Sequence, residues 1–556
     1  MLLRQSIHRI VMACLVVVLC AAPTLAQDQA AMDRLLERIV DNERDFLQFL
    51  QKSQPIVETY IQEVPAATDM DAPPRNDHYF LGRMSVTGEV TYESLIERED
   101  GRRRSRPAPA AGRVSFLPRG FAQMTVIDAA QFDRQTYRFQ YVRREFLGEV
   151  RCLVLDVAPA DARAAGRFIG RIWVEDREFR IVRFNGTYTS APKGSRWRFF
   201  SGASNEIYYH FDSWRVQVAP GRWTPAFVYI EEGGEEDASR PRFKGQTRIW
   251  GFQVSLAKVD ELTRVLIESE TRLNDQSGTR DVSPLESQRN WERQAEENVV
   301  ERLEKAGLLA PPGDVDKVLN TVVNNLIVTN NLGVAEVRCR VLLTTPLETF
   351  SMGQTIVISR GLVDVLPDEA SLAMVLAGEL AHIALGHRTE TSFAFHDQTM
   401  AADTEVLRRF RFERPADQMS AAARKAIEFL KNSPYKDKLA NAGLFLKALQ
   451  SRAPHLPRLI QANLGNQLAS GEHLARFSEL VASAPALAEG TLDQIAALPL
   501  GSRIKVDPWS ARITMVKTRP VALLSAREKM PFEVTPVVIH LTRGETPANP
   551  VQARQE

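Results

Sequence analysis

The stretch from residue 371 to residue 387, SLAMVLAGELAHIALGH, holds the residues best suited to chemistry. A helical H-E-x-x-H motif points two imidazoles at one zinc ion from positions i and i+4, and its glutamate acts as the base toward zinc-bound water. Here Glu379 and His382 stand at the base and second-ligand positions, and Gly378 stands at the first-ligand position. Glycine has nothing to coordinate and costs about 1 kcal/mol of helix stability relative to alanine. The spacing therefore predicts a metallopeptidase helix whose general base is vestigial and whose metal site is incomplete.

Substitute ligands remain an open alternative. His387 follows His382 by five residues, roughly 140° around a helix, so we expect it to face elsewhere. A metal site could be rebuilt only if other side chains fold back toward His382, and the candidates are His396, Asp397, Glu413 and Asp417. One imidazole with one carboxylate holds zinc too weakly to position a water molecule. We therefore expect no cofactor, or zinc if such ligands exist.

The run ETFSMGQTIVISRGLVDVLPDEASLAMVLAGELAHIALGHR (348–388) resembles the catalytic core of the HtpX/BepA group of gluzincin metalloendopeptidases. The resemblance covers about residues 301–450. It implies that the third zinc ligand is a glutamate on a downstream helix. Counting back from Tyr435 places Ala421 at that position, and a rival placement puts Pro415 there. It also implies that a substrate chain pairs with an edge strand formed by Thr355, Ile356, Val357 and Ile358.

The elements before this core change character along the chain. Apolar residues at helical spacing predict one or two amphipathic helices between residues 33 and 64. Short aromatic and β-branched runs between residues 78 and 258 predict an antiparallel sheet or open barrel. The arginine-rich insert at 101–113 is expected to be a solvated loop. Helical periodicity returns at 285–330 and dominates from residue 368 to about residue 477.

The strand-rich half is similar to LolA and related outer-membrane lipoprotein-sorting proteins. The similarity rests on FLGEVRCLVLDVAP, GRFIGRIWVEDREFRIVRF and FDSWRVQVAPGRWTPAFVYIEE, in that order. It implies a half-barrel whose concave apolar face could hold an acyl chain or a hydrophobic peptide. The alternative is that the protein's own helices fill this face.

We therefore expect an α+β multidomain chain, in which an antiparallel β half-barrel precedes a mainly helical zincin-like domain with a small sheet. The expected parts are a signal peptide (1–26), a helical segment (27–74), a LolA-like β domain (75–260), a helical linker (261–300), a metalloendopeptidase-like domain (301–470) and a β-rich C-terminal appendage (471–556).

Composition and the N-terminal sequence limit which partners and which compartment we expect for the protein. A net charge of +1 gives no basic excess for binding nucleic acid. Arg4 and Arg9 precede an apolar run and small residues up to Ala26, the layout of a secretory signal peptide. The mature chain is then exported, with no transmembrane segment, and the two resemblances imply a bacterial periplasm. Cys152 and Cys339 are expected to be buried free thiols.

Three functions are compatible with these observations. The leading hypothesis is a non-catalytic factor for envelope quality control that binds extended or misfolded envelope polypeptides. The alternatives are an active zinc-dependent endopeptidase with substitute ligands, and a carrier of lipids, acyl chains or lipoproteins.

Overall fold

The computed structural model describes residues 30–65, 74–96, 116–161, 163–189, 209–232, 242–253, 284–389, 407–468, 477–487, 500–501, 503–516 and 532–543. The expected signal peptide, the insert at 101–113, and His396 with Asp397 lie outside these residues.

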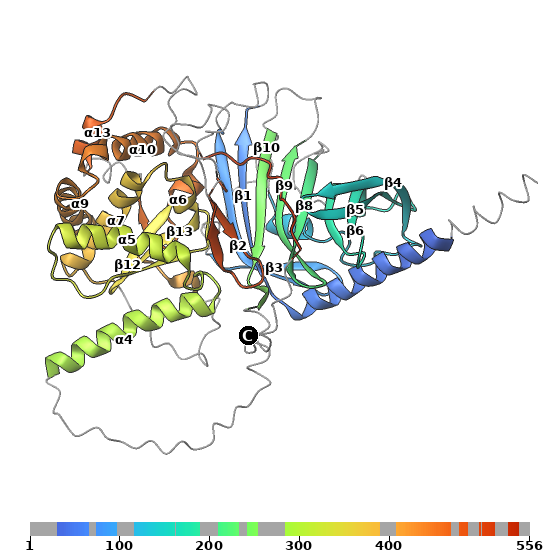
Figure 1. Ribbon diagram of the computed structural model, residues 1–556, viewed down its shortest axis with the longest axis horizontal. Coiled ribbons are helices and arrows are strands. Elements are labelled where there is room, and N and C mark those ends of the chain that lie inside the picture. The colour runs from blue at the N-terminus through green and yellow to red at the C-terminus, as the bar shows by residue number, and fades with distance from the viewer. Residues whose placement is uncertain are drawn as a thin grey trace, which may run out of the picture.

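Within the described residues, ten strands form one open antiparallel sheet in the order β3-β2-β1-β10-β9-β8-β7-β6-β5-β4 (Figure 1). Its strands are β1 (Ile56–Val64), β2 (Asn76–Val86), β3 (Val90–Ser94), β4 (Tyr137–Leu147), β5 (Val150–Pro159), β6 (Phe168–Glu175), β7 (Ile181–Tyr188), β8 (Tyr209–Ala219), β9 (Arg222–Glu232) and β10 (Arg242–Trp250). Consecutive β-branched and aromatic runs separated by turn residues account for the up-and-down pairing from β4 to β9.

The expectation of helix as far as residue 64 is wrong. The N-terminal helix (residues 30–52) ends before Pro55, and β1 starts at Ile56. Proline disfavours helical geometry in the residue before it. The first seven residues of β1 are buried, because this strand lies inside the sheet between β2 and β10.

One face of the sheet is packed with the protein's own side chains. Leu36 and Ile39 of the N-terminal helix, with Phe121 of α2 (Pro118–Gln123), join a buried cluster with Phe168 and Phe211 of the sheet. This arrangement matches the alternative in which helices fill the apolar face.

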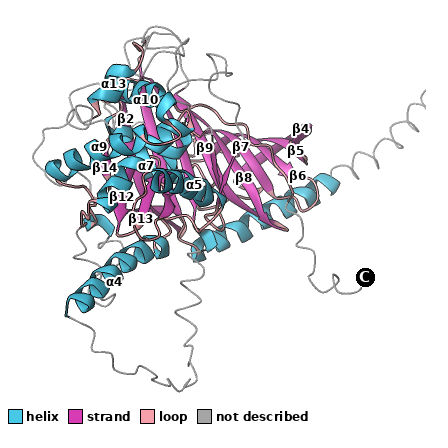
Figure 2. Cartoon of the chain, turned by 60° about the vertical axis from the view of Figure 1, so that its left-hand side comes forward, coloured by secondary structure: helices cyan, strands magenta, loops and turns pink. Residues whose placement is uncertain are grey.

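The second half is mainly helical and contains a small sheet. Its helices are α4 (Pro284–Lys305), α5 (Asp314–Thr329), α6 (Arg360–Val365), α7 (Glu369–Ala384), α9 (Ala416–Lys431), α10 (Leu439–Arg452), α11 (Pro457–Ile460) and α13 (Ser478–Ser483), with the short 3-10 helix η2 (Lys436–Lys438). In the described part of the chain, β11 (Arg338–Leu342), β13 (Thr355–Ser359), β12 (Glu348–Met352) and β14 (Asn466–Gln467) form a sheet in that order. Helices α5, α7, α9 and α10 gather around this sheet, to one side of the large one (Figure 2). The expected fold class is confirmed.

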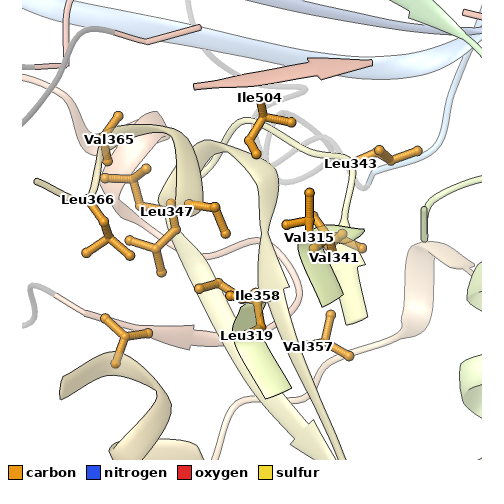
Figure 3. Close-up of a cluster of buried hydrophobic side chains, with 14 of the residues drawn as sticks. Val315, Leu319, Val341, Leu343, Leu347, Val357, Ile358, Val365, Leu366 and Ile504 are labelled. Carbon is orange, nitrogen blue, oxygen red and sulfur yellow. The ribbon is translucent and has the colours of Figure 1, made fainter. Parts of the chain in front are cut away.

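One of the three buried hydrophobic clusters in the described residues spans both halves. A single buried cluster runs from residues of the large sheet, such as Tyr60 and Trp250, into α5, α7 and the small sheet. Figure 3 shows part of it, where Val315 and Leu319 of α5 lie near Val341 and Val357 of the small sheet.

Buried polar contacts cross the boundary between the halves as well. Glu58 on β1 forms a buried ion pair with Arg360 at the start of α6, at 2.7 Å between Oε2 and Nη2. Asp77 on β2 accepts hydrogen bonds from the backbone N–H groups of Arg458 and Leu459, both at 2.8 Å. The Trp250 indole N–H donates to the Gly307 carbonyl at 2.9 Å. The halves are therefore locked together by specific contacts.

The described residues of the predicted β-rich appendage (471–556) pack against the rest of the chain. Helix α13 packs on α10, and the hairpin of β15 (Ile504–Val506) and β16 (Ile513–Met515) contacts α6 and α5. Residues 532–543, which we call the C-terminal strap, cross a face of the large sheet. One end bonds Gln62 on β1, and at the other end Arg543 pairs with Glu175 on β6 at 2.9 Å.

No helix in the described ranges is long and apolar enough to cross a membrane. Cys152 on β5 and Cys339 on β11 are buried free thiols, and burial raises the pKa of each to about 12. Neither thiol is reactive in this state, because the nucleophile is the thiolate.

Candidate functional site

Helix α7 presents the GELAH residues to the interior. The side chain of Asp368 caps its N-terminus by accepting a hydrogen bond from the Ser371 N–H at 2.8 Å. Both Glu379 and His382 are almost fully buried. A Cβ atom at Gly378 would meet no atom within 4 Å, so the first-ligand position is open space. The backbone geometry of a metallopeptidase helix is retained while one ligand is missing.

Helix α9 faces α7 where the third ligand is expected. The residues that line the space between the two helices are Met419, Ala422 and Ala423, and Ala421 does not line it. Of the two positions that the family resemblance implies for the third ligand, neither Ala421 nor Pro415 lines this space. Ala422 and Ala423, which line this space beside Met419, carry no metal-binding group.

The remaining cavity at this site holds about 30 Å³. That volume is about enough for one water molecule. Its walls are largely apolar, with Glu379, His382, Thr349 and Asn466 as the polar residues. The cavity as it stands is too small for a substrate.

One oxygen of the Glu379 carboxylate is hydrogen-bonded, and the other, Oε2, is buried without a hydrogen-bond partner among the described residues. Its Oε1 accepts a hydrogen bond from the Asn466 side-chain amide at 3.0 Å. Burial raises the pKa of Glu379, and the Asn466 hydrogen bond and the nearby positive charge of Arg414 partly offset that rise. In a working site this carboxylate would instead face a metal-bound water.

Arg414 supplies a positive charge close to Glu379. Its Nη2 donates to the Ser351 carbonyl and hydroxyl, both at 3.0 Å, and to the Thr389 hydroxyl at 2.8 Å. The side chain is buried, and its charge favours ionised Glu379. The guanidinium therefore compensates a buried carboxylate without metal.

His387 does not face away from His382 as the helical spacing predicts. Helix α7 ends at Ala384, and Gly386 takes a positive φ of 68°, so the chain turns back. The two Nδ1 atoms lie 2.9 Å apart, and one ring must donate while the other accepts. Burial and Arg414 lower the pKa of His387, which favours the neutral ring that such a pair requires.

The strand Thr355–Ile358 is not the edge strand that the family resemblance implies. Strand β13 lies between β11 and β12, and it pairs with both along its length. The strand that borders the site is β12, where Thr349 lines the cavity.

Part of the outer edge of β12 is already occupied by the protein itself. Strand β14 pairs antiparallel with it, Asn466 opposite Thr349 and Gln467 opposite Glu348. The Glu348 carboxylate accepts three backbone N–H groups, from Asn463, Leu464 and Gly465, at 2.7–3.0 Å. An internal segment thus lies where an extended chain could add to the sheet.

The residues present do not fit zinc. Across the described ranges, no group of three or more His, Cys, Asp or Glu side chains could hold a metal ion. At the two missing positions the chain has a glycine and small apolar residues, which offer no donor atoms.

A match to known proteins agrees with this geometry. Residues 317–433 match the model of peptidase family M48. This M48 segment contains most of α5, the small sheet without β14, and all of α6, α7 and α9. The family resemblance inferred from the sequence is confirmed for these residues. No curated protein matches the chain significantly.

Solved structures are similar to other parts of the chain. A putative outer membrane lipoprotein-sorting protein domain from Vibrio parahaemolyticus is 12% identical, with a TM-score of 0.19, over 36% of this chain and 89% of that one. A DUF1329 family protein from Desulfovibrio piger is 10% identical, with a TM-score of 0.21, over 38% of this chain and 90% of that one. At these TM-scores the likenesses carry no functional argument.

Sequence reasoning missed two residues that shape the site. Asn466 and Arg414 come from outside the helix motif, and no local pattern in the sequence pointed to either of them.

Proposed function

We propose that this protein is a non-catalytic, peptidase-fold factor of the bacterial envelope that binds extended polypeptides. The proposal that the protein is non-catalytic rests on the lack of metal-binding side chains at two of the three ligand positions. Of the three ligand positions, His382 alone keeps a donor side chain, and the Glu379 carboxylate bonds Asn466. Hydrolysis needs a fixed, polarised water, which such a site has no metal to hold.

Polypeptide binding is supported by what lies on β12. The antiparallel pairing of β14 shows that the outer side of this strand accepts an extended segment through backbone hydrogen bonds. A bound polypeptide would add along β12 beside this segment or displace it. Export to a periplasm is part of the proposal and rests on the signal-peptide pattern of residues 1–26.

A carrier of acyl chains is less well supported. The apolar face of the large sheet is packed with Leu36, Ile39 and Phe121. An acyl chain would have to displace these side chains, at a cost of about 1.5–3 kcal/mol for each one exposed.

A photoactivatable residue tests the polypeptide-binding role. Leu385 is exposed just after α7, near the site, and Tyr141 is exposed on β4 of the large sheet. With the crosslinker at Leu385, we expect capture of a reduced, carboxymethylated polypeptide that cannot fold. The same crosslinker at Tyr141 is the matched control and should capture little. Equal capture at both positions, or none at either, contradicts the proposal.

An active zinc peptidase remains the second candidate because of the His382–His387 pair, whose two ring nitrogens lie close together. Metal content of the purified chain, prepared without a metal-binding tag, decides between the two. We expect well under one zinc per chain and no cleavage of casein. About one zinc per chain, with cleavage lost in Glu379→Gln, would establish the enzyme instead.

A further inference from the structure

A second cavity lies in the other half of the molecule, between the N-terminal helix and two turns of the large sheet. It measures about 540 Å³ and shares no lining residue with the M48 site. Figure 1 draws the helix in blue alongside the sheet. The cavity is lined by Arg38, Asn42, Glu43, Asp45, Phe46, Phe49, Glu178, Arg180, Ile181, Arg215, Pro220, Gly221, Arg222 and Trp223. Its volume is in the range of small-molecule sites.

One of its four arginines is neutralised by the protein. Arg215 and Glu43 form a buried bidentate ion pair, with both N–O distances 2.7 Å. The Arg215 guanidinium also lies 4.0 Å from the centre of the Phe46 ring. This pair fixes the helix to the sheet and leaves no net charge.

The other three arginines make no ion pair with any described residue. Arg38 stacks over Phe179 at 4.3 Å, and Arg222 lies 5.3 Å from the Phe49 ring centre. Arg180 donates one N–H to the Asn42 carbonyl at 3.0 Å. Three guanidiniums therefore face one cavity with donors to spare.

Buried donors around the cavity also lack acceptors. The Arg180 Nε, the Arg215 Nε and the Trp223 Nε1 are buried, with no hydrogen-bond partner in the described part of the chain. Arg215 and Trp223 are less than 5% exposed. Unmet buried donors cost roughly 1–3 kcal/mol each, so a side-chain shift that let an acceptor of a ligand reach them would be favoured.

The charge balance and the walls define the ligand. Against the three unpaired arginines the cavity has two acids, Asp45 and Glu178, which leaves an excess of one positive charge. Phe46, Phe49 and Trp223 supply apolar surface beside the guanidiniums. We propose that this cavity binds a small amphiphilic carboxylate, its anionic group on Arg180 and Arg222 and its apolar part against the aromatic side chains. The planar guanidinium fork matches a carboxylate in geometry.

Calorimetric titration of the purified full chain with decanoate tests the proposal. Decanol, which has the same chain without charge, and decyl phosphate, which carries more charge, are the comparison ligands. We expect decanoate to bind at least tenfold more tightly than decanol and more tightly than decyl phosphate. Equal binding of decanol overturns the anionic site, and tighter binding of decyl phosphate overturns the carboxylate assignment.

Variants locate the binding. Arg222 is exposed, so Arg222→Gln should leave the fold intact while weakening decanoate binding at least tenfold. Arg180→Gln should do the same, and Arg222→Lys should restore part of the affinity. Arg144→Gln on β4 is the matched control, because Arg144 is also exposed but lines no part of the cavity. Unchanged affinity in Arg222→Gln and Arg180→Gln, with thermal unfolding intact, overturns the site.

Discussion

At the scale of single residues, the metal-binding side chains are missing from two ligand positions, whereas the residue at the general-base position, Glu379, is retained. Gly378 leaves open space where a Cβ would point, and Ala422 faces it from α9. The scaffold between these positions is retained. A metal site should therefore be recoverable by substitution.

We predict that Gly378→His with Ala422→Glu creates a zinc site together with His382. The three donors would then have the usual set of two imidazoles and one carboxylate. Metal analysis of the double variant should give close to one zinc per chain. The matched control is Gly378→Gln with Ala422→Gln, which adds similar volume without those ligands and should remain metal-free. A double variant as poor in zinc as this control would mean that the helices are not positioned for coordination.

A second prediction concerns Asp77, whose pKa burial raises to about 6. Between about pH 4 and pH 6 the folded chain keeps a proton on Asp77 that the unfolded chain has released. The stability that this group contributes is therefore present below pH 4 and lost as the pH rises through 6. A shift of about two pKa units corresponds to about 3 kcal/mol.

Denaturant titrations at several pH values between 4 and 7 check this prediction. The difference in unfolding free energy between the wild type and Asp77→Asn should change across that range, in favour of the variant at the higher pH. A difference that stays constant with pH would show that Asp77 titrates normally.

From the sequence alone, the residues that belong to the site could be predicted only where a motif fixes the spacing between them. Glu379, His382 and Gly378 follow from helical geometry alone. The partnership of His382 with His387 did not, because it depends on the turn at Gly386 that ends the helix. Asn466 and Arg414 reach Glu379 through tertiary contacts that no local pattern encodes.

At the scale of elements, the Glu348 side chain anchors the segment that leads into β14. Glu348 accepts the N–H groups of three consecutive residues, the pattern by which a carboxylate anchors a loop. Removing the acceptor leaves those donors unmet, which costs roughly 1–3 kcal/mol.

We therefore predict that Glu348→Ala loosens residues 463–468 and exposes β12. Hydrogen exchange at these residues should accelerate at least tenfold, while exchange in α10 stays unchanged. Crosslinking of the unfolded polypeptide at Leu385 should rise in the same variant. The matched control is Glu428→Ala, an exposed carboxylate on α9. Unchanged hydrogen exchange at residues 463–468 would mean that pairing with β12 is enough to hold β14 in place.

The sequence predicted whether most segments are helices or strands, but it did not predict which strands pair with one another. Periodicity and turn residues identified the antiparallel strands and the helices from α4 to α10. The position of β1 inside the sheet was missed, because Ile56–Val64 follows an amphipathic helix and its apolar spacing fits either structure. The order β11-β13-β12 was missed because the sequence of a short apolar strand does not indicate which strands pair with it.

At the scale of the whole molecule, the buried pair of Glu58 and Arg360 couples the two halves. Both side chains are at most 2% exposed, and Thr345 and Tyr79 also bond the glutamate. Breaking a buried pair by removing one partner leaves an uncompensated charge, which typically costs 3–5 kcal/mol.

We predict that Arg360→Ala lowers the unfolding free energy by about that amount and separates one unfolding transition into two. Circular dichroism and tryptophan fluorescence, followed through the same denaturant titration, should no longer coincide. The double variant Glu58→Gln with Arg360→Met should lose much less, since neither residue then carries an unpaired charge. Coincident transitions in Arg360→Ala would show that the shared apolar core alone couples the halves.

The C-terminal strap also bears on how the chain reaches its native state. Gln62, fully buried on β1, bonds the Phe532 carbonyl and the Val534 N–H across 470 and 472 sequence positions. A growing chain folds its N-terminal parts first, but these two bonds must wait until residue 534 has been made. A polypeptide that ends before residue 532 would leave the Gln62 carbonyl without the Val534 N–H, and the Gln62 amide would keep only the Tyr60 hydroxyl as its acceptor. The ten strands can therefore all be present while the last buried polar contacts of β1 are still missing, so that chains cut before residue 532 should be less stable than chains that include the strap.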